Sequence, residues 1–268
     1  MRERVTITIK EDVLKQVDRI VDGLTIRSRS QAIEFLLSKT LSDYRLKNAL
    51  ILAGGKDLIK GIPKKSKFIL EINGKYLIEK VINNLEEFHT GKITVSMDSN
   101  KEQIIKKLNE KKISVDFLEL DKASGTIEPI NKMKNNFKDT FAVVHGDTLS
   151  SLNLNEMLEF HQSNKALATI ALTTVNNPKD YGVAMLQGKK ITEFIEKPKN
   201  EAGSYLISAG YYIFEPEIFK YISRDMKSIE KDLFPKLAEK GLLNGYPFQG
   251  IYLNVNTKKD FEKAKRIL

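Results

Sequence analysis

The chain contains 268 residues, of which 41% are hydrophobic and 29% charged, and its formal net charge is +9. These values are typical of a soluble globular protein with one large domain or two of unequal size, and the positive charge indicates an anionic partner, either nucleic acid or phosphorylated small molecules. The lack of cysteine excludes disulfides and thiolate metal sites, and no apolar run approaches the ~20 residues of a membrane helix, so we expect a cytoplasmic protein without a membrane partner.

Residues 4–10 are predicted to form a half-buried strand, because hydrophobic and polar residues alternate strictly there. One face carries Val5, Ile7 and Ile9, and the other carries Arg4, Thr6 and Thr8. Two amphipathic helices are predicted to follow. The first opens at Glu11 and ends near Gly23, and the second opens at Ser28 or Ser30.

A single strand cannot satisfy its own backbone groups, and so short a segment cannot bury a stable core. The simplest remedy is a second copy of the chain, so we expect a homodimer whose two strands pair antiparallel. This order of elements over residues 2–43 resembles the ribbon-helix-helix DNA-binding family, relatives of the Arc and MetJ repressors. The resemblance implies a DNA-binding and dimerisation domain over residues 1–43, joined by a linker over residues 42–47 to a larger domain.

The same resemblance implies specific contacts to an operator. The outward side chains of Arg4, Thr6 and Thr8 would enter the major groove, which admits a two-stranded ribbon. Arg29 and Ser30, at the start of the second helix, would bring backbone amides to a phosphate. The alternative is a ribbon that serves dimerisation alone, since alternating Thr and Ile are common in strands.

From residue 48 onward, strand and helix patterns alternate. Strands are predicted over residues 48–53, 92–97, 113–120 and 140–144, with helices over 77–85, around 103–108 and within 124–135, and the chain becomes β-rich from residue 166. This alternation predicts an α/β domain over residues 48–268, built on a doubly wound, mainly parallel Rossmann-like sheet.

The most informative stretch spans residues 48–74. An apolar strand ends there at Gly54 and Gly55, which puts bare backbone amides at the carboxyl end of a sheet, where open α/β sheets bind ligands. Glycine lets the backbone approach a phosphate, and lysines supply mobile positive charge. The following loop holds Lys56, Lys60, Lys64, Lys65 and Lys67. We therefore predict a nucleotide site, and the alternative is an ordinary turn followed by a solvated basic loop.

A second buried strand runs from Phe141 into His145, Gly146 and Asp147. Asp147 is expected at the same sheet edge as the glycine pair, where its carboxylate could hold a Mg²⁺ that also touches phosphate oxygens. The alternative is that Asp147 caps a helix over residues 154–160. His145 is a possible base, although a single histidine beside a strand end is more often structural.

In chain order, these motifs resemble the sugar-phosphate nucleotidyltransferases, also called nucleoside-diphosphate-sugar pyrophosphorylases. The matching segments are residues 52–55 (Leu-Ala-Gly-Gly), 73–75 (Asn-Gly-Lys), 125–126 (Gly-Thr), 146–147 (Gly-Asp), 181–183 (Tyr-Gly-Val), 196–198 (Glu-Lys-Pro) and 208–210 (Ser-Ala-Gly). The resemblance implies the fold of the nucleotide-diphospho-sugar transferases. It also implies a reaction that joins a sugar 1-phosphate to a nucleoside monophosphate unit with release of pyrophosphate.

The resemblance further assigns roles to individual residues. It implies a nucleotide site at Gly54, Gly55, Gly125 and Thr126, a sugar site at Gly182 and Glu196, catalytic lysines at Lys67 and Lys197, and Mg²⁺ ligands at Asp147 and Asn254. For this Gly-Thr segment, the competing interpretation is a helix N-cap by Ser124 or Thr126.

Two departures from the family pattern concern charge. The loop after Gly55 lacks the family's Thr-Arg pair, and Asn254 stands where the family has its second metal-binding aspartate. Removing one such electrostatic contact costs on the order of 10²–10³ in rate. Our preferred hypothesis is therefore a DNA-binding regulator whose large domain senses a nucleoside triphosphate, sugar phosphate or sugar nucleotide. The alternative is an active sugar-phosphate nucleotidyltransferase with a fused dimerisation or DNA-binding domain.

Overall fold

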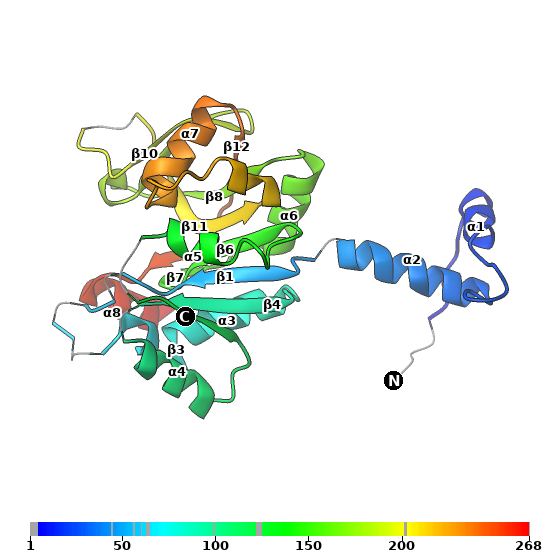
Figure 1. Ribbon diagram of the computed structural model, residues 1–268, viewed down its shortest axis with the longest axis horizontal. Helices are drawn as coiled ribbons and strands as arrows, with labels where there is room; N and C mark the ends of the chain where they lie inside the picture. Colours follow the sequence, from blue (N-terminus) through cyan, green and yellow to red (C-terminus); the bar gives the residue numbers. More distant parts are fainter. Residues whose placement is uncertain are drawn as a thin grey trace. The chain divides into compact units, whose positions relative to one another are not determined.

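The computed structural model divides into two compact units, residues 1–45 and residues 46–268 (Figure 1). It describes residues 5–43, 45–55, 57–59, 61–62, 65–98, 100–121, 125–200 and 203–267. Among these residues, no helix is both long and apolar enough to cross a membrane.

The small unit contains two helices, α1 (Glu11–Asp18) and α2 (Arg29–Asp43). The turn between them is organised by Asp22, whose Oδ1 accepts hydrogen bonds from the backbone N–H groups of residues 24–26 at 2.8–2.9 Å. Residues 5–10 belong to no strand, and Val5 and Ile7 are 74% and 55% exposed. The predicted strand therefore has no partner within the described part of the chain, and its pairing with a second copy stays a prediction.

The large unit is built on one mixed sheet of nine strands in the order β5-β4-β1-β6-β11-β8-β12-β10-β9. The strands are β1 (Asn48–Leu52), β4 (Lys92–Met97), β5 (Asp116–Glu119), β6 (Phe141–His145), β8 (Ala168–Thr174), β9 (Gly182–Gln187), β10 (Lys190–Glu196), β11 (Leu206–Phe214) and β12 (Leu243–Pro247). Two short ribbons lie outside this sheet, β2 (Glu71–Ile72) with β3 (Lys75–Tyr76), and β7 (Thr148–Ser150) with β13 (Tyr252–Asn254).

The prediction of a mainly parallel sheet holds for the first four strands in the sheet order, whereas beyond β6 the pairing is mixed, with β12 parallel to β8. Strands β5, β4, β1 and β6 are parallel, as alternating strands and helices require. Strand β11 then lies antiparallel between β6 and β8, and the hairpin of β9 and β10 is also antiparallel. The sheet is mixed because the β-rich part of the chain adds hairpins to its far edge.

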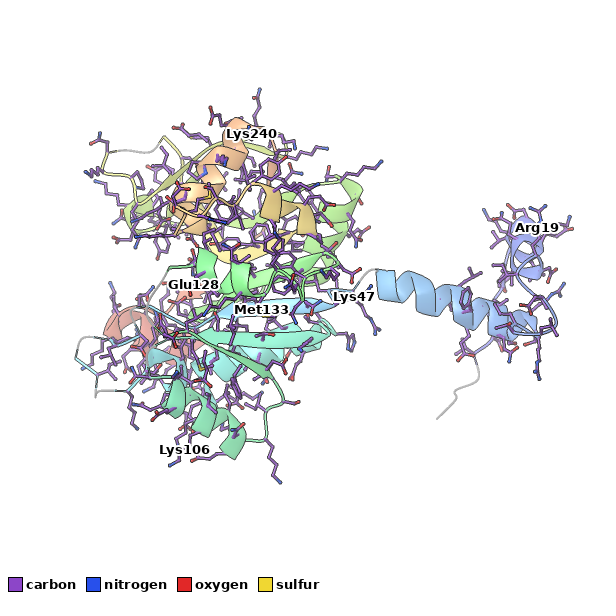
Figure 2. All side chains as sticks on the ribbon, in the orientation of Figure 1. Arg19, Lys47, Lys106, Glu128, Met133 and Lys240 are labelled. Carbon is purple, nitrogen blue, oxygen red and sulfur yellow. The ribbon has the colours of Figure 1, made fainter. Side chains whose placement is uncertain are left out.

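Both faces of the sheet are buried, which explains the continuous apolar runs of its central strands. In β1, Ala49 and Ile51 pack into one core, and Leu50 and Leu52 pack into the other. The first core is completed by α3 (Leu77–Glu87), α4 (Lys101–Glu110), α6 (Leu154–Ser163) and α8 (Lys258–Ile267), and the second by α5 (Ile127–Lys132) and α7 (Phe234–Glu239). Charged side chains such as Lys106 and Lys240 lie at the periphery of the unit (Figure 2).

Candidate active site

The carboxyl ends of β1, β4 and β6 lie side by side at one edge of the sheet. Leu52 at the end of β1 pairs in register with Ser96 of β4 and His145 of β6. Parallel strands bring the residues that follow them to the same edge, so Gly54, Asp98 and Asp147 gather there. The sequence predicted the positions of the glycine and of Asp147, but not that of Asp98.

An ion pair between Lys67 and Asp147 lies at this edge. The Lys67 Nζ donates to Asp147 Oδ2 at 2.5 Å, and the two side chains are only 6% and 12% exposed. Burial alone would raise the pKa of Asp147, but the neighbouring Lys67 ammonium outweighs this effect and lowers it. Lys67 begins the 3₁₀ helix η1 (Lys67–Ile69), so it is a fixed interior charge rather than the mobile loop charge that we expected.

Two asparagines contact this ion pair, Asn254 at the end of β13 and Asn256 just after it. Asn254 pairs in register with Thr148, and its Nδ2 donates to Asp147 Oδ1 at 3.2 Å and to Thr148 Oγ1 at 3.0 Å. Asn256 contributes its Oδ1 as an acceptor for Lys67 at 2.5 Å, and its side-chain amide donates to Asn254. The structure thus brings Asn254 beside Asp147, although the two residues are 107 positions apart in the chain.

Asp147 does not cap the helix that follows it. The N-cap of α6 is Asn153, whose side chain accepts from the backbone N–H groups of Asn155 and Glu156. The carboxylate of Asp147 is instead directed at Lys67 and Asn254. Among the described residues there is no group of three or more acidic or histidine side chains that could hold a metal, so any ion here takes most of its ligands from substrate or water.

A cavity of about 100 Å³ adjoins the glycine pair. It is lined by Leu52, Gly54, Gly55, Ser96, Asp98, Leu120, Gly125, Thr126 and Pro129. The backbone N–H of Gly55 donates to both carboxylate oxygens of Asp98, at 3.1 and 2.9 Å. A Cβ on Gly54 would lie 2.8 Å from Asp98 Oδ2, so a larger residue at that position would require the Asp98 side chain to shift. The cavity therefore brings together all four residues that were predicted to bind the nucleotide.

Because residue 125 is glycine, the wall of this cavity can contact residues 227–230, a segment about 100 residues later in the chain. Gly125 has φ +84°, and a Cβ there would lie only 2.1 Å from the carbonyl oxygen of Lys227. Thr126 accepts from the backbone N–H of Ile229 at 2.8 Å and donates to Glu230 Oε2 at 3.0 Å. Thr126 occupies the N-cap position of α5, as the alternative interpretation had it, but its side chain makes no capping hydrogen bond to that helix.

A second cavity, of about 190 Å³, contains the predicted metal ligands and part of the predicted sugar site. It is lined by His145, Asp147, Asp180, Tyr181, Glu196, Lys197, Ser208, Gly210, Tyr212, Glu230, Tyr252, Asn254 and Asn256. Lys197 has φ +53°, and its side chain is 63% exposed and lies 4.0 Å from Glu196, so Lys197 is a charge at the rim. Gly182 leaves room for Glu196, because a Cβ there would lie 2.8 Å from its Oε2.

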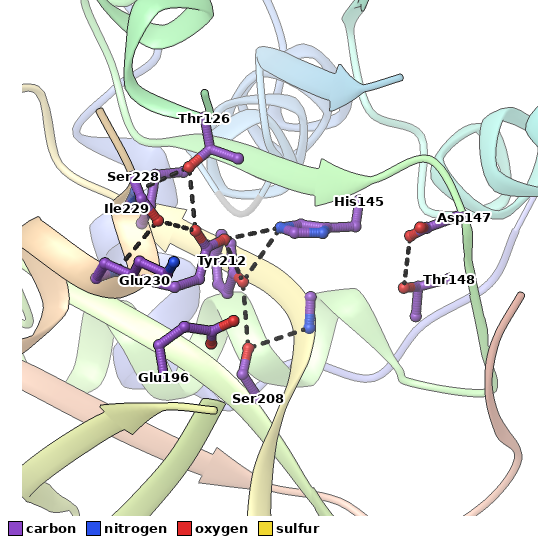
Figure 3. A network of polar contacts seen from close by, with 12 residues as sticks. Thr126, His145, Asp147, Thr148, Glu196, Ser208, Tyr212, Ser228, Ile229 and Glu230 are labelled. Atoms are coloured by element: carbon purple, nitrogen blue, oxygen red, sulfur yellow. Dashed lines mark hydrogen bonds and ion pairs between the residues drawn. The ribbon is translucent and has the colours of Figure 1, made fainter. Parts of the chain in front are cut away.

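A polar network lies at the wall of this second cavity (Figure 3). The His145 Nε2 lies 2.9 Å from Glu230 Oε1, and the Tyr212 hydroxyl lies 3.2 Å from the same oxygen. Burial disfavours the charged forms of His145 and Glu230. Their contact with each other nevertheless raises the pKa of His145 and lowers that of Glu230 to about 2. The pKa of Glu196 is raised, first by its burial and then by the nearby Glu230 carboxylate.

Sequence reasoning missed Asp98, Glu230 and Asn256. Asp98 follows a strand that was predicted correctly, so its place at the sheet edge was available as a signal. Glu230 lies in a π-helix, η4 (Ile229–Leu233), whose irregular backbone has no clear signature in sequence. Asn256 lies two residues after Asn254, the residue of that segment on which the sequence analysis concentrated.

Of the residues predicted to bind DNA, the structure describes Thr6, Thr8, Arg29 and Ser30. The guanidinium of Arg29 is paired with Asp18, at 2.6 and 2.8 Å, and this pair does not involve the backbone amides that were predicted to meet a phosphate. Thr6, Thr8 and Ser30 are exposed and belong to no ribbon in the described chain. Arg4, Lys56, Lys60, Lys64 and Ser124 lie outside the described residues.

Comparison with known proteins gives a consistent result for the large unit. A family model described as "Nucleotidyl transferase" matches residues 48–267. The chain is 31% identical over 222 residues to a "Putative mannose-1-phosphate guanyltransferase" of Sulfolobus acidocaldarius, a match covering 80% of this chain and 61% of that protein. It is 32% identical over 226 residues to a "Mannose-1-phosphate guanyltransferase" of Yarrowia lipolytica, covering 79% of this chain and 61% of that protein. The chain thus spans less than two thirds of the length of these relatives.

Solved structures show the same fold. A putative glucose-1-phosphate thymidylyltransferase from Bacillus anthracis matches with a TM-score of 0.71 at 23% identity, over 82% of this chain and 94% of that one. The protein HddC from Yersinia pseudotuberculosis matches with a TM-score of 0.72 at 23% identity, over 82% of this chain and 99% of that one.

These relatives overturn our preferred hypothesis of a DNA-binding regulator. The curated relatives carry the names of transferases, the family match begins at residue 48, and none of these comparisons indicates a ribbon-helix-helix domain in the small unit. Inferring a sensor from two missing charges was therefore wrong, and the comparisons favour the enzyme.

Proposed function

Because the chain belongs to the nucleotidyl transferase family, we propose that it is a sugar-1-phosphate nucleotidyltransferase. In this reaction a phosphate oxygen of the sugar 1-phosphate attacks the α-phosphorus of a nucleoside triphosphate. The bond from that phosphorus to the bridging oxygen breaks, and pyrophosphate leaves as a nucleoside diphosphate sugar forms. The names of the relatives make GTP and mannose 1-phosphate the first substrates to test.

Two cavities lie next to each other at one edge of the sheet, and this arrangement is the main observation that supports the proposal. Leu52 lines the smaller cavity and His145 the larger, and these residues pair directly on neighbouring strands. The smaller cavity, with Gly54, Gly55 and Thr126, is the nucleotide side of the proposal. The larger cavity, with Glu196 and Lys197, is its sugar-phosphate side.

Two lysines, Lys67 and Lys197, supply the positive charge that the reaction needs. Lys67 is held rigid by Asp147 and Asn256, so its ammonium requires no reorganisation when negative charge develops on a phosphate. Lys197, at the rim, meets the phosphate of the incoming sugar as a mobile cation. Both lysines thus bind and orient phosphate groups, which is the main contribution a protein makes to phosphoryl transfer.

Asp147 and Asn254 form a donor set that fits Mg²⁺. They offer one carboxylate and one amide oxygen, and Mg²⁺ characteristically takes one or two protein carboxylates and completes its shell with phosphate oxygens and water. Turning the Asn254 amide would present its oxygen where its nitrogen now meets Asp147. When bound, the ion neutralises charge on the phosphate groups.

We also propose that the protein is a homodimer through its small unit. Val5 and Ile7 share one face of an extended segment and are largely exposed, as are Leu24 at 80% and Leu37 at 55%. A second copy would cover these side chains, because among the described side chains of the two helices only Val17 and Ala32 are buried.

The reaction is tested by measuring pyrophosphate release with Mg²⁺ across nucleoside triphosphates and sugar 1-phosphates. We expect release that requires both substrates, and Asp147→Asn should lower it by about 10²-fold or more. Asp116→Asn is the matched control, because Asp116 forms an exposed surface pair with Lys92 and should leave activity unchanged. If no substrate pair gives pyrophosphate, the proposed function is wrong.

A further inference from the structure

One buried carboxylate, that of Glu230, touches the walls of both cavities. Its Oε2 accepts from Thr126, which lines the smaller cavity, at 3.0 Å. Its Oε1 lies 2.9 Å from His145 and 3.2 Å from the Tyr212 hydroxyl, and both of these residues line the larger cavity. Figure 3 shows Glu230 between Thr126 on one side and His145 on the other.

The backbone around Glu230 is tied to the nucleotide side by more than this contact. Ile229 donates its N–H to Thr126 Oγ1 at 2.8 Å, and Ile127 donates its N–H to the carbonyl oxygen of Lys227 at 3.1 Å. Gly125 makes the close approach possible, as described above. A shift of Thr126 on nucleotide binding would therefore move the whole segment that carries Glu230.

Glu230 is also held in place by its contacts on the side of the larger cavity. Glu230 is 8% exposed, and its π-helix is a rare conformation found often at functional sites. The hydroxyl of Tyr212 also contacts Ser208, and its ring packs edge-on against His145 with ring centroids 5.6 Å apart. Displacing the carboxylate would thus move two side chains of the larger cavity at once.

We propose that Glu230 is a positioning residue that couples nucleotide binding to sugar-phosphate binding. The inference rests on the proposed function, since it assigns one substrate to each cavity. A nucleoside triphosphate that orders Thr126 fixes Glu230, and the fixed carboxylate holds His145 and Tyr212 in the arrangement that receives the sugar. By thermodynamic linkage, each substrate raises the affinity for the other by the same factor.

The chain contains a matched control for a merely structural role. Glu215 accepts from Thr140 at 2.8 Å and lies 3.1 Å from Nε2 of the buried His161, so it forms a comparable Thr–Glu–His cluster. Neither Glu215 nor His161 lines either of the two cavities. A substitution there tests for loss of a partly buried carboxylate that contacts a histidine, without touching the proposed coupling.

The experiment measures the dissociation constant of mannose 1-phosphate by calorimetry, with and without a GTP analogue that has an imido group between its α- and β-phosphorus atoms. The reciprocal titration is also made. If another pair releases pyrophosphate faster, that sugar phosphate and the matching analogue are used. For the wild type we expect each ligand to tighten the other about 5–150-fold. In Glu230→Gln this factor should fall towards one, whereas Glu215→Gln should keep it.

Thr126 provides a second test that leaves the buried carboxylate in place. Thr126→Val should lose the coupling factor, and Thr126→Ser, which keeps the hydroxyl, should retain it, so the result stands even if Glu230→Gln does not fold. A wild type that binds both ligands independently, or variants that leave the factor unchanged, would overturn the inference alone. A wild type that binds neither ligand would overturn the proposed function and the inference with it.

Discussion

Replacing Lys67 by methionine should destabilise the large unit strongly. The substitution keeps a chain of similar length but removes the ammonium that lies 2.5 Å from Asp147 Oδ2. Asp147 would then be a buried carboxylate that has lost its cationic partner and keeps neutral ones, among them the amide of Asn254 and the hydroxyl of Thr148. Breaking a buried pair in this way costs about 3–5 kcal/mol, a large fraction of the ~5–15 kcal/mol that stabilises a typical domain.

The pH dependence of this loss has a definite sign. In the wild type the pKa of Asp147 is lowered, so its charged form stabilises the fold above the ordinary pKa of 3.8, and this contribution is lost as the pH falls through the folded-state pKa. Without Lys67, burial would raise the pKa of Asp147 instead. The difference between the wild type and Lys67→Met should therefore be largest near neutral pH and shrink on acidification.

Urea unfolding of the wild type, Lys67→Met, Asp147→Asn and the double variant measures the effect. We expect the double variant to be more stable than Lys67→Met, because it leaves no buried charge unpaired. Lys92→Met is the control, since its pair with Asp116 is about half exposed on both sides and should contribute under about 1 kcal/mol. A loss in Lys67→Met as small as that of the control would refute the reasoning from burial.

Three further predictions follow from the site and the small unit. Asn254→Asp adds a second carboxylate beside Asp147, so Mg²⁺ should raise its melting temperature more than that of the wild type, and equal shifts in a magnesium titration would contradict this. Glu230 has its pKa lowered to about 2 from 4.5, so its contribution to stability should be present above pH 4.5 and fade as the pH falls towards 2. Urea unfolding of the wild type and Glu230→Gln at several pH values checks this, and a difference that grows on acidification would show the sign to be wrong. In sedimentation, the full chain should be a dimer and Ile7→Lys a monomer, and a monomeric wild type at micromolar concentration would rule out the homodimer.

The sequence was sufficient to predict the strands that carry the site. Strands β1 and β6 are buried on both faces, so their apolar runs are continuous and easily recognised. The rule that parallel strands end at one edge then brings Gly54 and Asp147 together without any structure. The same rule applies to Asp98, which follows β4, but neither its place at that edge nor its contact with Gly55 was predicted.

The rest of the site depends on contacts that no local pattern encodes. Glu230 acquires its role from Thr126, which lies 104 residues earlier in the chain. Lys67 was read as a mobile surface charge because it follows a lysine-rich loop, yet a turn of 3₁₀ helix buries it against β6 and the segment after β13. The antiparallel insertion of β11 likewise reflects how distant hairpins pack, which periodicity alone does not determine.

Residues near position 255 cover the Lys67–Asp147 ion pair. This has a consequence for the synthesis of the chain on the ribosome. Asp147 is 80 residues after Lys67, but Asn256 is 189 residues after it. At the ~5–20 residues per second of translation, about 10–40 s separate the synthesis of Lys67 from that of Asn256. During that time the nascent sheet can form with its ion pair uncovered. A chain released before residue 252 would contain the strands of the nine-stranded sheet but would lack Asn254 and Asn256, so its Lys67–Asp147 pair would stay uncovered.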